Sequence, residues 1–150
     1  MTPPRRTQLL SLLALAVAIP AIVAAGTDPI KARQDTMEGV GGAMKALSGI
    51  ARGEAKFDAT TVQAKAKEIA AAFDAAAELF PAGSDQGASE TWAKPGIWTN
   101  RADFDGKLQA AHAAALDLQK VTDEAAYRPA LGKLGAACKA CHESYRRPKE

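Results

Sequence analysis

The stretch GAACKACHESYRR, residues 135–147, contains both cysteines of the chain, Cys138 and Cys141, and one of its two histidines, His142. The two cysteines are three residues apart, which is the spacing of neighbours on one face of a helix. They extend a series of side chains that recur every three or four residues: Tyr127, Leu131, Leu134, Cys138, Cys141 and Tyr145. This period predicts a helix that turns its thiols toward the protein interior.

Three earlier segments have the same period. The first series is Ile30, Arg33, Met37, Val40, Met44 and Leu47; the second is Val62, Ala66, Ile69, Phe73, Ala76 and Phe80; the third is Phe104, Leu108, Ala111, Ala115 and Leu118. Gly-, Pro- and charge-rich stretches at 51–58, 81–100 and 120–124 separate them. Aromatic residues make up only 5% of the chain, which disfavours a sheet. The sequence therefore predicts an all-α protein, an antiparallel four-helix bundle.

The predicted helix ends rest on short local signals. Asp28 is a suitable N-cap for the first helix, and Pro29 suits its first position. Gly39, Gly41 and Gly42 weaken this helix, or they let a bulky group approach its backbone. Pro129 means that the fourth helix either begins near Tyr127 or bends there.

Residues 1–25 have the composition of a secretory signal peptide. Arg5 and Arg6 precede an apolar run, and Val23 and Ala25 suit a signal-peptidase site. We expect cleavage to leave residues 26–150 as a single domain in the periplasm. An uncleaved membrane anchor is the alternative, although the run is short and contains Pro20.

Loss of the signal peptide also changes the charge of the protein. The whole chain has a formal net charge of +2, and removal of the two arginines leaves 17 basic and 17 acidic residues. A neutral domain gives no support for nucleic-acid binding. No nucleophile constellation, acid–base pair or phosphate loop appears in the sequence, so we do not predict an enzyme.

The pentapeptide Cys-x-x-Cys-His is the attachment signal for c-type haem. Its two thiols add to the two vinyl groups of the porphyrin, and the imidazole that follows is brought to the iron as an axial ligand. A zinc site would need four ligands, and the chain has only two Cys and two His. A thioredoxin-like pair normally opens a helix after a strand. Covalent haem with iron ligated by His142 is the prediction; a haem-free helical protein that uses Cys138 and Cys141 as a redox or metal-binding dithiol is the alternative.

Three residues elsewhere bear on this prediction. Arg33 interrupts an apolar series, and a buried guanidinium needs an anionic partner such as a haem propionate, unless it extends out to solvent. Met37 lies one turn further on the same face, where it either packs in the core or stands over the haem. His112 lies one position off the third series and is expected at a boundary, with ligation as the alternative.

With these residues in hand, the sequence resembles the cytochrome c′ family, the class II c-type cytochromes. The resemblance rests on IKARQDTM, FPAGS, ETWAKPGIW and GAACKACHESYR, in this order, between Pro29 and Arg147. It implies a four-helix bundle, because cytochrome c′ is itself a known example of that fold. It also implies that Arg33 and Gln34 contact the haem propionates, with Glu90 and Thr91 from the long loop, and that Arg146 lies beside the imidazole of His142. Many family members have Arg or Lys where this chain has Trp92.

The resemblance implies two behaviours. In most members the iron is five-coordinate, and an apolar pocket, which Met37 would cover here, binds nitric oxide and carbon monoxide. In a low-spin subgroup a methionine of the first helix ligates the iron, and the protein only carries electrons. Met37 is compatible with both. The resemblance further implies redox partner proteins and a possible homodimer through the first two helices.

Overall fold

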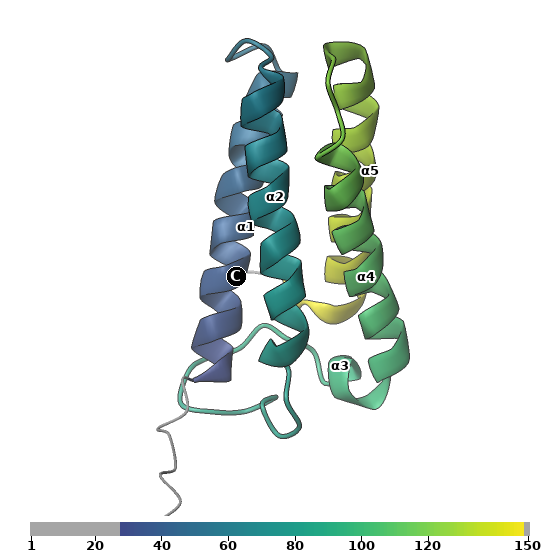
Figure 1. The fold of residues 1–150 in the computed structure, drawn as a ribbon. Coiled ribbons are helices and arrows are strands. Elements are labelled where there is room, and N and C mark those ends of the chain that lie inside the picture. Colours follow the sequence, from purple (N-terminus) through teal and green to yellow (C-terminus); the bar gives the residue numbers. More distant parts are fainter. Residues whose placement is uncertain (1–27, 149–150) are drawn as a thin grey trace, which may run out of the picture.

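The computed structural model describes residues 28–148, and the predicted signal peptide lies outside these residues. Four long helices run through them: α1 (Pro29–Ala51), α2 (Ala59–Ala76), α4 (Arg101–Leu118) and α5 (Glu124–Tyr145). A 3₁₀ turn, η1 (Ala77–Leu79), and a short helix, α3 (Gly96–Thr99), lie between α2 and α4. Figure 1 shows each long helix running opposite to its neighbours. The predicted antiparallel four-helix bundle is confirmed.

Aspartates begin three of the four long helices. Asp28 accepts a hydrogen bond from the backbone N–H of Ile30 at 2.9 Å, Asp58 from Thr61 at 2.7 Å and Asp123 from Ala126 at 2.9 Å. Each bond satisfies a donor that has no partner within its own helix. The predicted N-cap at Asp28 is confirmed, and the caps set where each helix begins.

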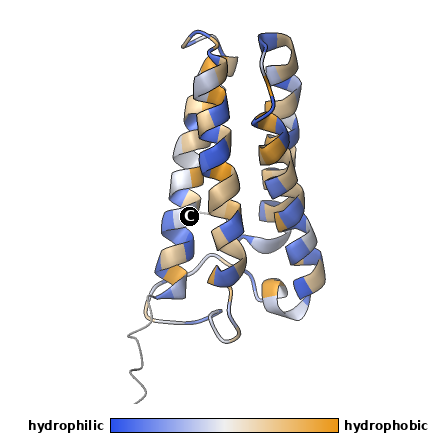
Figure 2. Ribbon diagram, viewed as in Figure 1, coloured by the Kyte–Doolittle hydropathy of each residue, from blue (hydrophilic) through white to orange (hydrophobic). Residues whose placement is uncertain are grey.

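The predicted inward faces form the core. In α2 and α4 every residue of the predicted series is buried, and in α5 the series is buried except at the two cysteines, which are half-buried. Figure 2 shows hydrophobic and hydrophilic residues mixed along each helix, as expected when only one face is inside. Tyr127 is fully buried, and its hydroxyl donates to the backbone carbonyl of Leu47, which ties α5 to α1.

Two local features that the sequence left open are decided by the structure. α5 begins at Glu124, three residues before Tyr127, and continues past Pro129; the cap at Asp123 favours this start. Gly39, Gly41 and Gly42 face outward. A Cβ added at any of them would meet no described atom within 4 Å, apart from its chain neighbours and the nearby backbone of α1 itself. These glycines therefore do not admit a close neighbour within the domain.

A long loop from Phe80 to Pro95 closes one end of the bundle (Figure 1). The residues after α5 pair with it: the backbone N–H of Arg147 donates to the carbonyl of Trp92 at 2.7 Å, and that of Lys94 donates to the carbonyl of Tyr145 at 2.9 Å. The loop is thereby fixed to the end of the helix that contains the cysteines. Within the described residues, no helix combines the length and the apolar composition needed to cross a membrane.

Candidate functional site

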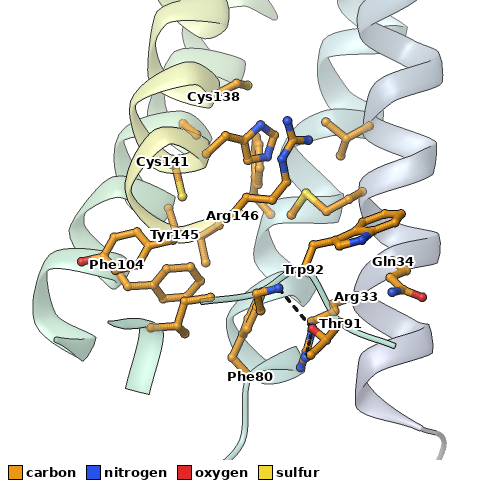
Figure 3. A pocket seen from close by; sticks show the side chains of 18 of the residues that line it. Arg33, Gln34, Phe80, Thr91, Trp92, Phe104, Cys138, Cys141, Tyr145 and Arg146 are labelled. Carbon is orange, nitrogen blue, oxygen red and sulfur yellow. Dashed lines mark hydrogen bonds between the residues drawn. The ribbon is translucent and has the colours of Figure 1, made fainter. Parts of the chain in front are cut away.

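A cavity of about 560 Å³ lies inside the bundle, with walls from all four long helices and the loop. This volume is within the range of roughly 300–1,000 Å³ typical of small-molecule and cofactor sites. Figure 3 shows Cys138 and Cys141 projecting from α5 on one side and Arg33 and Gln34 on the α1 side. The cavity therefore brings together the two ends of the sequence that contain the predicted site residues.

Cys138, Cys141 and His142 all line the cavity. Burial raises the pKa of both thiols, so they are protonated at neutral pH. Burial also lowers the pKa of His142, and the nearby charge of Arg146 lowers it further. The imidazole is therefore neutral near pH 7, and this is the form whose nitrogen lone pair can bind a metal.

Apolar side chains form most of the remaining wall. The α1 side contributes Met37 and Val40, and Phe73 of α2 lies beside them in the lining. None of these three side chains carries an N–H or O–H donor. The other apolar lining residues are Phe80, Ile97, Phe104, Leu108 and Ala111. A flat apolar group would find hydrophobic contacts with α1 and α2 on one side, and with the thiols and the residues of α4 on the other.

Arg33 is 4% exposed, so the alternative in which it extends into solvent was wrong. Its guanidinium donates to the carbonyl of Ser84 at 2.8 Å and to the hydroxyl of Thr91 at 2.7 Å. Longer bonds reach the Ser84 hydroxyl at 3.2 Å and the Leu79 carbonyl at 3.4 Å. These acceptors are all neutral, and Arg33 makes no ion pair with a carboxylate of residues 28–148. No carboxylate of the described residues thus lies within ion-pair distance of this buried cation, and Asp28 and Asp85 attract it only from further away.

Of the other three residues predicted to contact a propionate, two line the cavity and one does not. Gln34 and Thr91 line the cavity, and the Gln34 amide donates to the backbone carbonyl of Glu90 at 2.7 Å. Glu90 itself is exposed and is not among the lining residues. Trp92, in place of the usual basic residue, also lines the cavity. Their contacts with a propionate stay predictions.

The two remaining predicted residues, Arg146 and His112, differ in whether they line the cavity. Arg146 lines the cavity near His142. His112 lies outside the lining, and its Nε2 is 3.3 Å from a carboxylate oxygen of Asp74. This is the boundary position expected for it.

Sequence reasoning missed the residues that hold Arg33. Ser84 is a buried loop serine, and the guanidinium stacks 5.1 Å from the ring centre of Phe80 and 5.6 Å from that of Trp98. Such cation–π contacts stabilise a desolvated guanidinium. FPAGS and ETWAKPGIW contain these residues, but nothing in their spacing indicated that they meet at Arg33.

The lining fits a covalently bound haem. Two thiols three residues apart and an adjacent neutral imidazole face one space, across from an apolar wall, and a buried unpaired cation lies at its side. These are the groups that would hold the vinyl carbons, the iron, the porphyrin face and a carboxylate, respectively. Fold and site together define a helical-bundle protein of the c-type cytochrome class.

Comparison with known proteins gives the family. A family model described as cytochrome C′ matches residues 28–146. Cytochrome c-556 of Agrobacterium fabrum is 37% identical over 86% of this chain and 86% of its own length. Cytochrome c′ of Rhodopseudomonas palustris is 36% identical over 83% of this chain and 86% of its own length, and its structure superimposes with a TM-score of 0.79 over 83% of this chain and 100% of that one.

The chain belongs to the cytochrome c′ family. Proteins of this family bind a covalent haem c that contains iron, and they serve in electron transfer or gas binding. Haem c is thus the cofactor of this protein.

Proposed function

We propose that Cys138 and Cys141 hold the haem through thioether bonds and that His142 is the axial ligand of its iron. The observation that carries this proposal is the shared cavity, which all three side chains line from one helix. The raised pKa of both thiols argues against the dithiol alternative, because reactive cysteine pairs depend on a lowered pKa.

Arg33 is proposed to stabilise the propionates. Its charge is buried and has no carboxylate of the described domain within ion-pair distance, so an anionic group beside it is favourable. Gln34 and Thr91 lie on the same side of the cavity and assist. Glu90 contributes only if its exposed side chain turns inward. Burial, assisted by the charge of Arg146, lowers the pKa of His142 and favours the neutral imidazole that can bind the metal.

The proposed role is one-electron transfer together with binding of nitric oxide and carbon monoxide. The bound haem supplies the redox-active iron and a face on which a diatomic gas can bind. Met37, Val40 and Phe73 would surround that face without a hydrogen-bond donor, which disfavours stable binding of oxygen. A variant of cytochrome c′ from Alcaligenes xylosoxidans, 29% identical over 81% of this chain with a TM-score of 0.74, has been solved as its nitric oxide complex.

Met37 also supports a second candidate, a low-spin electron carrier in which its sulfur ligates the iron. It lines the cavity and is half-buried, so its side chain can approach a group bound there. Ligation would close the face to gases and leave electron transfer alone. We propose a periplasmic location for either role, with redox proteins as partners and no substrate reaction.

The test of haem attachment uses protein exported with a haem-attachment system. We expect the colour to survive acid–acetone extraction and to give a pyridine haemochrome band. Replacement of both cysteines by alanine should remove the covalent haem. A colourless wild-type protein, or full extraction of its haem, would refute the proposal.

Ferric and ferrous visible spectra, with and without nitric oxide, then separate the two roles. A high-spin spectrum that changes on addition of nitric oxide supports gas binding. A low-spin spectrum that becomes high-spin in Met37→Ala supports ligation by Met37. Met44→Ala is the matched control, because Met44 is also half-buried against the core but does not line the cavity.

A further inference from the structure

A second hollow, of about 360 Å³, lies on the outer surface next to His142. It is lined by Lys94, Lys139, His142, Glu143, Arg146 and Arg147, and we call it the basic hollow. His142 and Arg146 line both this hollow and the cavity. The basic hollow is therefore the outer surface of the wall that the proposed iron ligand forms on the inside.

The charge of the basic hollow differs from that of the rest of the protein. Four cationic side chains surround it against the single carboxylate of Glu143, whereas the chain without residues 1–25 has no net charge. The connection between α4 and α5 is different: residues 117–128 carry three acidic and two basic side chains. The excess of positive charge is thus local to the basic hollow, at the His142 end of α5.

The cations of the basic hollow do not converge on one point. Lys94 donates to the backbone carbonyl of Glu143 at 2.9 Å, and Lys139 lies 3.6 Å from the Glu143 carboxylate. Arg147 donates to the carbonyl of Thr91 at 2.6 Å. Protein oxygens therefore already engage three of the four cations, which suits a broad acidic surface better than a small chelated anion.

We propose that the basic hollow docks the acidic surface of a redox partner protein and brings that partner to the His142 side of the haem. This inference rests on the proposed function, because it assigns the route by which electrons reach the iron. Complementary charge raises the rate of encounter and orients the partners. Redox complexes are typically small and transient, so a shallow charged surface is sufficient.

Two lysines provide a matched pair of variants. The Lys139 side chain is 75% exposed and pairs with Glu143, and the Lys120 side chain is 74% exposed and pairs with Asp117 at 2.9 Å. Lys120 precedes His142 by 22 residues, most of them in α5, so it lies roughly 30 Å away along the bundle at 1.5 Å per residue. Lys139→Glu reverses one positive charge of the basic hollow, and Lys120→Glu makes the same charge reversal near the opposite end of the bundle.

The first measurement is binding without electron flow. ¹⁵N-labelled haem-loaded protein is titrated with an oxidised flavodoxin of strongly acidic surface, at low ionic strength. We expect amide shifts around Lys94, Lys139 and Arg147. Lys139→Glu should lower the apparent affinity for flavodoxin at least threefold, and Lys120→Glu should leave it unchanged. Shifts centred elsewhere, or equal effects of the two variants, would overturn the proposal.

The second measurement is the rate of haem reduction by the reduced flavodoxin. The wild-type rate should fall as ionic strength rises, because the Debye length shortens from about 30 Å at 0.01 M to about 8 Å at 0.15 M. Lys139→Glu should slow reduction about threefold to tenfold at low salt, on the scale of electrostatic steering. A Lys139→Glu effect seen with ferrocyanide but absent with flavodoxin would overturn protein docking. Absence of covalent haem refutes the proposed function separately, whereas loss of the difference between the two lysine variants in haem-loaded protein refutes only the basic hollow.

Discussion

Replacement of Arg33 by alanine tests how the loop over the cavity is held. Arg33 donates four hydrogen bonds to three residues: Leu79 at the end of η1, and Ser84 and Thr91 of the loop. The two hydroxyl acceptors keep other partners, because the Ser84 hydroxyl donates to Pro81 and the Thr91 hydroxyl accepts from Ala93. The carbonyls of Leu79 and Ser84 are the groups that lose a buried donor.

The expected loss of stability follows from these two carbonyls and the ring contacts. Each buried group left without its hydrogen bond costs about 1–3 kcal/mol. The contacts with Phe80 and Trp98 add about 1 kcal/mol. Burial lowers the pKa of Arg33, so part of this gain is offset by the cost of keeping the charge inside. We expect a net loss of about 3 kcal/mol, which for a domain of this size lowers Tm by roughly 10 °C.

The assay is thermal unfolding of the haem-loaded protein by circular dichroism, with limited proteolysis of residues 80–95 as a local measure. Lys31→Ala is the control on the same helix: Lys31 is exposed and pairs only with Asp35, so its loss should cost well under 1 kcal/mol. Arg33→Lys should recover little, because an ammonium group cannot reproduce the planar fork. If Arg33→Ala lowered Tm by no more than Lys31→Ala, or if Arg33→Lys restored it fully, the reasoning would be refuted.

Two further predictions concern stability. Gly41→Ala should raise the free energy of unfolding by up to about 1 kcal/mol in denaturant titrations, because Gly41 is helical, exposed and free of neighbours within the described domain. Gly53→Ala should lower it, since φ is +79° there; a loss at Gly41 as well would contradict the outward placement. A hydrogen bond to Asp103 and burial raise the pKa of Tyr145 to about 12, so the unfolded chain, with a tyrosine pKa near 10, loses its proton first. Stability should therefore fall between pH 10 and 12, and less steeply in Tyr145→Phe; identical slopes in unfolding midpoints across that range would contradict this.

The fold was predictable because one period runs through all four helices. Asp28 and Pro29 set the start of α1, and the apolar series of α2 and α4 became core without exception. The start of α5 relative to Pro129 could not be decided from sequence. A proline inside a helix destabilises it locally, but the cap at Asp123 and the burial of Tyr127 both favour the longer helix.

The candidate site was predictable in part. The chemistry of Cys138, Cys141 and His142 depends on spacing within one helix, so sequence alone could bring them together. The surroundings of Arg33 depend on a loop about fifty residues later in the chain, where Ser84 and Thr91 have no periodic pattern. Long-range contacts of this kind leave no local signal, and only the structure reveals them.

The pairing between the end of α5 and the long loop has a consequence for the order in which the domain can form. Residues 92–94 are made some fifty positions before their partners at 145–147. A chain that emerges from its amino end can assemble α1, α2 and α4 first, but it cannot close the cavity until residue 147 is available. Completion of the chain and closure of the pocket are thus successive events, with a time window between them.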